Sequence, residues 1–158
     1  MPAQYPERIV CLTEETTETL YLLGQQARIV GISGFTVRPP EARREKPRVS
    51  AFTSAKIDRI LDLRPDLVLG FSDLQADIAA QLVRAGLEGH VFNHRSVAGI
   101  LRTIAMIGGL VGCESKAAAL VARLEAHLAG VAAAAAVLPP RPRGHFEEWN
   151  EPQIPAIE

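Results

Sequence analysis

The sequence predicts an α/β protein in which a parallel sheet is flanked by helices. The clearest evidence is the stretch Lys56–Asp73, where a helical apolar stripe is followed by Pro65 and then by the unbroken apolar run Leu67–Leu69. Such a run is typical of a strand that is covered on both faces, as in parallel sheets. Strand and helix patterns alternate with short links over residues 1–112, which predicts parallel strands joined by right-handed crossovers.

Four short strands are expected in the first half of the chain. They cover residues 8–13, 28–33, 48–51 and 67–69, and the helices among them cover residues 15–23 and 57–61. Gly24 is the expected stop of the first helix, and Ser54 is the expected N-cap of the second. Pro39 and Pro40 give the loop after the second strand a fixed course.

Two helices and one strand are expected next. Ser72 and Gln75 have the spacing of a capping box at the start of a helix. A strand over residues 90–93 follows, and Ser96 is the expected cap of a second helix, whose apolar residues keep helical spacing throughout. The order strand, helix, strand, helix is therefore maintained.

The longest expected element is a helix over residues 114–138. Apolar residues recur in it at every third or fourth position, and alanine, the best helix former, supplies most of the others. At about 1.5 Å per residue this helix spans roughly 40 Å, which is longer than a small lobe is wide. Pro139 and Pro140 end the helix.

Composition limits the function classes that the chain can belong to. Its length of 158 residues is enough for a real core, and its net charge of −1 predicts no broad attraction to nucleic acid or anionic membranes. Cys11 and Cys113 lack metal-site spacing and are expected to be separate thiols. No apolar run approaches the length of a membrane span, and no signal peptide is recognisable, so the chain is expected in the cytoplasm unless a leader was removed.

A pattern of helix, proline, aspartate and strand covers residues 57–68. The residues that form it are Ile57, Ile60, Leu61, Leu63, Pro65, Asp66, Leu67 and Val68. This pattern resembles the substrate-binding proteins of ABC importers for cobalamin, ferric siderophores and haem, in which one long helix joins two α/β lobes. The resemblance implies an N-terminal lobe over 1–112, a spine helix over 113–139, and the opening strand of an incomplete C-terminal lobe over 140–158.

The carboxyl ends of the expected parallel strands carry the candidate ligand-binding residues, because ligands of open α/β sheets bind at this edge. The residues expected there are Glu14 and Glu15, Phe35, Phe52, Phe71 with Ser72 and Asp73, and His94 with Arg95. A row of aromatic side chains suits a broad, flat and partly apolar ligand such as a corrin or a porphyrin. The alternative is that the rings only close the end of the sheet.

The family resemblance adds detail to this site. Cobalamin-binding members carry aromatic side chains at the places of Phe35, Phe52 and Phe71. Phenylalanine has no hydroxyl or indole donor, so polar recognition has to come from other residues. Cobalamin, haem and ferric siderophores are the candidate ligands, and Trp149, in the expected opening strand of the second lobe, is a further candidate contact.

Glu14, Glu15 and His94 each have two interpretations. The glutamates either contact the ligand or interact favourably with the dipole of the helix that they begin. His94 is either an axial metal ligand at the cleft edge or a solvent-facing loop histidine. The sequence has no metalloprotease, dithiol, phosphate-loop or nucleophile-elbow motif, so no enzymatic activity is expected.

These observations predict a substrate-binding component of an ABC-type importer for a corrinoid or iron-chelate ligand. The resemblance implies an ABC permease and its ATPase as partners, a docking role for Asp77, and a periplasmic or extracellular location. The rival hypothesis, which the missing leader favours, is a cytosolic α/β module that handles a metal-containing cofactor without a transporter. Exposed apolar residues on the spine helix, such as Leu128 and Val131, also predict a homodimer through this helix and the terminal strand.

Overall fold

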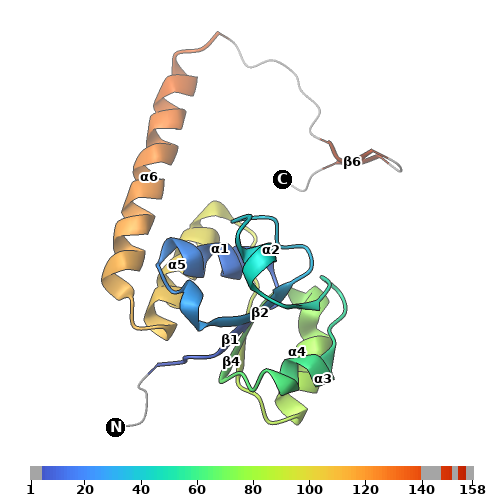
Figure 1. The fold of residues 1–158 in the computed structure, drawn as a ribbon. Helices are drawn as coiled ribbons and strands as arrows, with labels where there is room; N and C mark the ends of the chain where they lie inside the picture. The colour runs from blue at the N-terminus through green and yellow to red at the C-terminus, as the bar shows by residue number, and fades with distance from the viewer. Residues whose placement is uncertain (1–4, 140–146, 151–152, 156–158) are drawn as a thin grey trace. The chain divides into compact units, whose positions relative to one another are not determined.

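The computed structural model describes residues 5–139, 147–150 and 153–155, the last two ranges as backbone. The chain divides into two compact units, residues 1–124 and residues 125–158. The first unit is an α/β lobe, and the second contains the end of a long helix and a β-hairpin (Figure 1).

The lobe is built on a five-stranded parallel sheet, which confirms the predicted fold class. Its strands are β1 (Ile9–Cys11), β2 (Ile29–Ser33), β3 (Arg48–Ser50), β4 (Leu67–Phe71) and β5 (Gly89–Phe92), in the order β3-β2-β1-β4-β5. The chain adds β2 and β3 on one side of β1 and then β4 and β5 on the other. The order therefore reverses between β1 and β4, and a crevice at such a switch point is where ligands of this architecture bind.

Helices cover both faces of the sheet (Figure 1). They are α1 (Glu14–Leu22), α2 (Ala42–Glu45), α3 (Ile57–Asp62), α4 (Ala76–Arg84), α5 (Val97–Leu110) and α6 (Glu114–Ala136), with 3₁₀ turns η1 (Gln26–Arg28) and η2 (Asp73–Gln75). Because side chains alternate along a strand, Ile9 and Cys11 of β1 pack with α1, α5 and α6, whereas Val10 packs with α3 and α4. The sheet is thus buried on both sides, as its unbroken apolar strands predict.

The helix-start predictions have mixed outcomes. Ser96 caps α5 as predicted, because its hydroxyl accepts a hydrogen bond from the Gly99 amide at 3.1 Å. The Ser54 prediction is wrong: α3 begins at Ile57 and its N-cap residue is Lys56. A turn in which the Ser54 carbonyl accepts from the Ala51 amide at 2.8 Å precedes the helix and displaces its start.

The last turn before α4 also differs from the prediction. Ser72 caps η2 through its hydroxyl, which accepts from the Leu74 amide at 3.3 Å. Gln75 does not return a hydrogen bond to Ser72, whose own amide donates to the Phe92 carbonyl at 2.6 Å. The spacing of a capping box is therefore present without its reciprocal bond, and the Gln75 side chain turns inward instead.

The long helix α6 agrees closely with its predicted range. Its first turns bury Ala117 and Leu120 in the core of the lobe. By length and composition alone α6 could also cross a membrane, so the prediction that no apolar run approaches the length of a membrane span is wrong for this helix. Alanine supplies much of its apolar character. Leu128 and Val131, in the second unit, are exposed. The homodimer that such exposure suggests stays a prediction.

The second unit also contains an antiparallel hairpin of β6 (Glu147–Asn150) and β7 (Gln153–Pro155). A strand is therefore present within residues 140–158, as the family resemblance implies, and a second strand pairs with it. The side chain of Trp149 and the whole of Phe146 lie outside the described residues, so the predicted ligand contact of Trp149 stays a prediction.

Candidate functional site

Two of the predicted phenylalanines lie on one side of the sheet's carboxyl edge. Phe35 follows β2 and Phe52 follows β3, and both line an open hollow of about 330 Å³. The other residues that line it are Thr13, Glu14, Glu15 and Ser33. The Phe35 side chain is 63% exposed, whereas Phe52 is half-buried. This side of the edge is therefore an aromatic surface that is still largely open to solvent.

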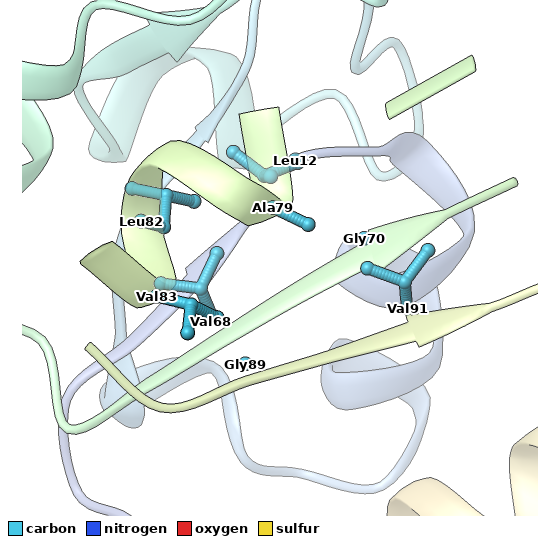
Figure 2. A pocket seen from close by; sticks show the side chains of 8 residues that line it. All are labelled: Leu12, Val68, Gly70, Ala79, Leu82, Val83, Gly89 and Val91. Atoms are coloured by element: carbon cyan, nitrogen blue, oxygen red, sulfur yellow. The ribbon is translucent and has the colours of Figure 1, made fainter. Parts of the chain in front are cut away.

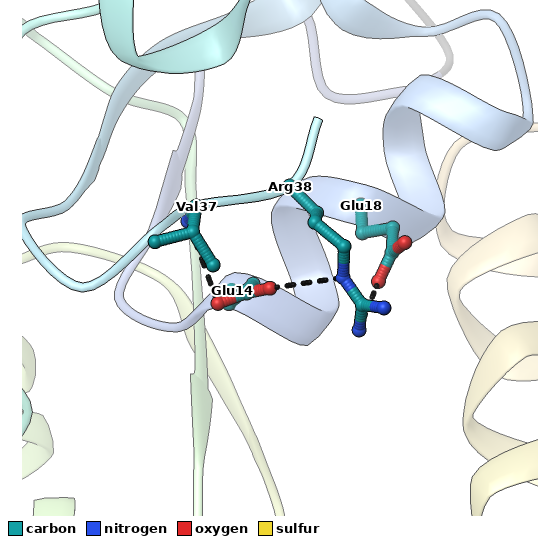
Figure 3. A network of polar contacts seen from close by, with 4 residues as sticks. All are labelled: Glu14, Glu18, Val37 and Arg38. Carbon is teal, nitrogen blue, oxygen red and sulfur yellow. Dashed lines mark hydrogen bonds and ion pairs between the residues drawn. The ribbon is translucent and has the colours of Figure 1, made fainter. Parts of the chain in front are cut away.

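Glu14 holds the loop that carries Phe35 (Figure 3). One carboxylate oxygen accepts from the Val37 amide at 3.4 Å, and the other lies 3.4 Å from Nε of Arg38. Nη2 of Arg38 also lies 3.5 Å from Glu18. Glu14 is thus committed to the protein's own loop, and its place in the first turn of α1 also suits the helix dipole.

Phe71 lies on the other side of the edge, at the end of β4, and is supported by two neighbours. Its ring centroid is 4.7 Å from that of His94, with the planes tilted by 47°. The guanidinium carbon of Arg95 lies 5.5 Å from the same centroid, and Arg95 is anchored by Asp73 at 2.7 Å. A cation over an aromatic face is an attractive arrangement, so Phe71 is held before any ligand arrives.

The backbone directly after Phe71 is unusual. Ser72 has a φ of 73°, a conformation that residues other than glycine rarely adopt. It is buried, and its hydroxyl is engaged as a cap. Ser72 therefore lies at the predicted edge, but its contacts are those of a residue that turns the chain from β4 into η2. Asp73 is exposed and paired with Arg95.

His94 follows β5 and is the polar residue best placed beside an aromatic ring. Its Nδ1 lies 2.9 Å from the hydroxyl of Thr103 on α5. Gly99 allows this close packing, since a Cβ there would lie 2.5 Å from that of His94. Burial lowers the pKa of His94; Glu15 partly opposes this change, and the positive charges of Arg95 and Arg102 reinforce it. The imidazole is therefore neutral near neutral pH.

Glu15 lines the hollow with Phe35 and Phe52, and its negative charge partly opposes the lowering of the pKa of His94 on the other side of the edge. Beyond His94 a further polar hollow of about 210 Å³ opens. Its lining includes His90, Asn93, Arg102 and Met106. The part of the chain that the structure describes contains no cluster of three or more histidine, cysteine, aspartate or glutamate side chains able to hold a metal ion.

The sequence did not predict the roles of three residues that support this edge. Arg38 pairs with two glutamates of α1, Thr103 holds His94, and Gln75 bonds to three backbone segments. Except for Phe71, which is four residues from Gln75, their partners lie 9 or more residues away along the chain, so no local pattern identifies them. The one available signal is the capping-box spacing of Gln75 with Ser72, and the structure shows that the Gln75 side chain is completely buried.

The comparison with known protein families agrees with the fold. The model of the periplasmic binding protein family matches residues 9–157, and the chain belongs to this family. Members of the family are substrate-binding proteins of ABC importers and are not enzymes, which agrees with the lack of catalytic motifs in the sequence.

Two relatives have similar sequences. A cobalamin-binding protein of Halobacterium salinarum is 31% identical over 131 residues, which are 80% of this chain and 35% of that protein. The uncharacterized ABC transporter substrate-binding lipoprotein YvrC of Bacillus subtilis is 31% identical over 127 residues, or 78% of this chain and 40% of that protein. The chain thus spans well under half the length of these relatives.

Solved structures share the fold. The periplasmic vitamin B12 binding protein BtuF of Vibrio cholerae superposes with a TM-score of 0.82 at 22% identity, over 95% of this chain and 58% of that chain. The periplasmic heme-binding protein RhuT of Roseiflexus sp. RS-1 superposes with a TM-score of 0.77 at 26% identity, over 89% of this chain and 54% of that chain.

Proposed function

We propose that this chain is the ligand-binding lobe of an ABC importer's substrate-binding protein, and that its ligand is a corrinoid or an iron chelate such as haem or a ferric siderophore. The observation that carries the proposal is the aromatic carboxyl edge, with Phe71 braced by His94 on one side and Phe35 and Phe52 around a hollow on the other. The cobalamin-binding and heme-binding proteins that share the sequence or fold support this ligand class.

Binding at this edge rests on burial and stacking. A flat ring system covers aromatic side chains well, and each aromatic pair adds about 0.5–1.5 kcal/mol beyond burial. The polar groups that phenylalanine lacks come from Glu15 and His94, which flank the rings, and from the Arg95–Asp73 pair. No bond is made or broken in the ligand.

The direct test is a titration of the purified chain with cyanocobalamin and, separately, with hemin, followed by absorbance. Binding of either ligand with one-to-one stoichiometry is expected. A single lobe encloses less of a ligand than a closed pocket does, so the affinity should be lower than that of a two-lobed relative. If neither ligand changes its spectrum at high protein concentration, corrinoid and haem binding are excluded, and a ferric siderophore is the one proposed ligand left to titrate.

The proposal includes an ABC permease and its ATPase as partners, at the periplasmic or extracellular side of the membrane. Asp77 is exposed on α4 near the carboxyl edge and is the proposed docking residue. An Asp77→Arg change in the two-lobed protein should then impair transport without changing ligand affinity, because a basic partner would be repelled. Asp58→Arg, at an exposed acidic residue of α3, is the matched control. Transport that is intact in Asp77→Arg excludes this docking role.

A further inference from the structure

The Gln75 side chain makes an unusual set of hydrogen bonds at the switch point of the sheet. Gln75 ends η2 and is completely buried. Its Oε1 accepts from the Phe71 amide at 3.0 Å, and its Nε2 donates to the carbonyls of Leu12 at 3.2 Å and Phe52 at 2.9 Å. Both donor hydrogens are therefore used, and a buried amide that is satisfied in this way specifies its surroundings strongly.

The three bonded segments lie at the carboxyl ends of three different strands. Leu12 follows β1, Phe52 follows β3 and Phe71 ends β4, and β3 is separated from β4 by two other strands. In the described part of the chain, the other backbone bonds of the Phe52 loop stay within residues 49–60 or reach Gly34, directly after β2, whose amide donates to the Ser50 carbonyl at 2.7 Å. The Gln75 amide is what joins this loop to the ends of β1 and β4.

We propose that Gln75 is a positioning residue of the ligand site, whose amide fixes the separation between the chain segments that carry Phe52 and Phe71. The inference rests on the proposed function only in taking these two rings as ligand contacts. Neither glutamate nor methionine could replace glutamine, because the first lacks the two donors and the second lacks every hydrogen bond. The ligand site would then be preorganised by a residue that touches no ligand. This raises affinity, because less conformational entropy is lost in ordering the two segments on binding.

The neighbouring packing supports this role. A Cβ at Gly70 would lie 2.8 Å from Oε1 of Gln75, so glycine leaves the room that the amide occupies. Gly70 and Leu12 also line a small apolar pocket of about 40 Å³ beneath α4 (Figure 2). Water is a poor substitute for a lost bond beside such apolar walls, so the amide is difficult to replace.

The test compares Gln75→Met with Gln81→Met, because Gln81 is exposed on α4 and, among the described residues, its amide bonds only to Asp77 of its own helix, at 3.2 Å. The first readout is hydrogen exchange of backbone amides by NMR without ligand. Loss of the bond to Oε1 should accelerate exchange at Phe71 by about tenfold or more in Gln75→Met, whereas Gln81→Met should leave it unchanged. The Ser72 amide, which bonds to Phe92, is the internal reference.

The second readout is the Kd for cyanocobalamin and for hemin. Gln75→Met should weaken binding about tenfold relative to Gln81→Met, since two ring-bearing segments lose their fixed separation. Unchanged exchange at Phe71 overturns the proposal, and so does faster exchange with an unchanged Kd, because the amide would then be structural support alone. If the wild-type chain binds neither ligand, the corrinoid and haem part of the proposed function fails, and the exchange readout still decides whether Gln75 fixes the segments.

A second variant covers the case in which Gln75→Met does not fold, as judged by circular dichroism. Gly70→Ala keeps Gln75 but places a methyl group against its Oε1, and its contacts to Val91 and Leu12, at 3.6 and 3.7 Å, are ordinary. The same faster exchange at Phe71 and the same weaker binding are expected. Wild-type behaviour of Gly70→Ala on both readouts overturns the proposal.

Discussion

The two sides of the carboxyl edge carry the same kind of residue in very different settings. Phe71 is flanked by His94 and Arg95, and its backbone is bonded to Gln75. Phe35 is 63% exposed, its amide donates to the Ser33 hydroxyl at 3.2 Å, and its loop is held by long contacts of 3.4–3.5 Å to Glu14 and Glu18. An aromatic side chain that is already ordered loses less conformational entropy on binding than one that is free to move. The β4–β5 side is therefore the preorganised half of the site, and the β2 side is the adaptable half.

The largest expected effect is on ligand affinity. Phe71→Ala should raise the Kd for the ligand that binds by a few-fold to about tenfold, because an ordered stacking partner is lost. Phe35→Ala should raise the Kd less, because the entropy lost in ordering the loop that carries Phe35 offsets part of the stacking energy of this ring. The measurement is the absorbance titration, with Leu74→Ala, at an exposed residue beside the site, as the control. A larger loss in Phe35→Ala than in Phe71→Ala would reverse the comparison.

The next effect concerns the support of His94. Thr103→Val keeps the shape of a buried side chain but removes the hydroxyl 2.9 Å from Nδ1. The free energy of unfolding should fall by about 0.5–1.5 kcal/mol, the usual cost of one hydrogen bond. Denaturant unfolding measures this change, and affinity should fall with it if His94 braces Phe71. No loss of either would show that the His94 ring is held by packing alone.

The sequence was informative where structure depends on neighbouring residues and uninformative where it depends on distant ones. Pro65 and the apolar run after it locate β4, and so the place of Phe71, because both signals are local. Ser96 was recognisable as a cap for the same reason. The role of Gln75 was not, since its partners Leu12 and Phe52 are 63 and 23 residues away.

The error at Ser54 has a related cause. Its residue type and its place before an apolar helix satisfy the local rule for an N-cap. An isolated bridge between Ser50 and Ala55 extends the non-helical backbone past Ser54, so the helix starts later. Pairing between segments decides this boundary, and a cap rule that considers only the following residues does not include such pairing.

A smaller effect is expected on the adaptable side. Glu14→Gln keeps an oxygen that can accept from the Val37 amide but removes the charge that pairs with Arg38. Because Arg38 is 69% exposed, the lost ion pair should cost only about 0–1 kcal/mol of unfolding free energy. Exchange of the Val37 amide should change little in Glu14→Gln and increase in Glu14→Ala. Equal exchange in both variants would mean that Glu14 does not hold the loop.

The smallest effect is a pH dependence on the preorganised side. Burial lowers the pKa of His94 in the folded chain below its ordinary value of 6.5, against the opposing charge of Glu15 and with the help of Arg95 and Arg102. Between the ordinary value and the lower folded one, the unfolded chain binds more protons than the folded chain does. Stability therefore decreases as pH falls through this window, and His94 causes no such dependence above it.

His94→Asn isolates this contribution, because the other histidines are unchanged in both proteins. Denaturant midpoints should be measured from pH 7.5 down to pH 4.5. The variant loses the contact with Phe71 at every pH, which gives a constant offset, but the difference from wild type should shrink as pH falls below about 6.5. The reason is that the wild type has the His94 imidazole, whose protonation favours unfolding, and the variant does not. A difference that stays constant with pH would mean that the fold does not perturb His94, and that its place beside Phe71 is more open to water than its packing against Gly99 and Thr103 indicates.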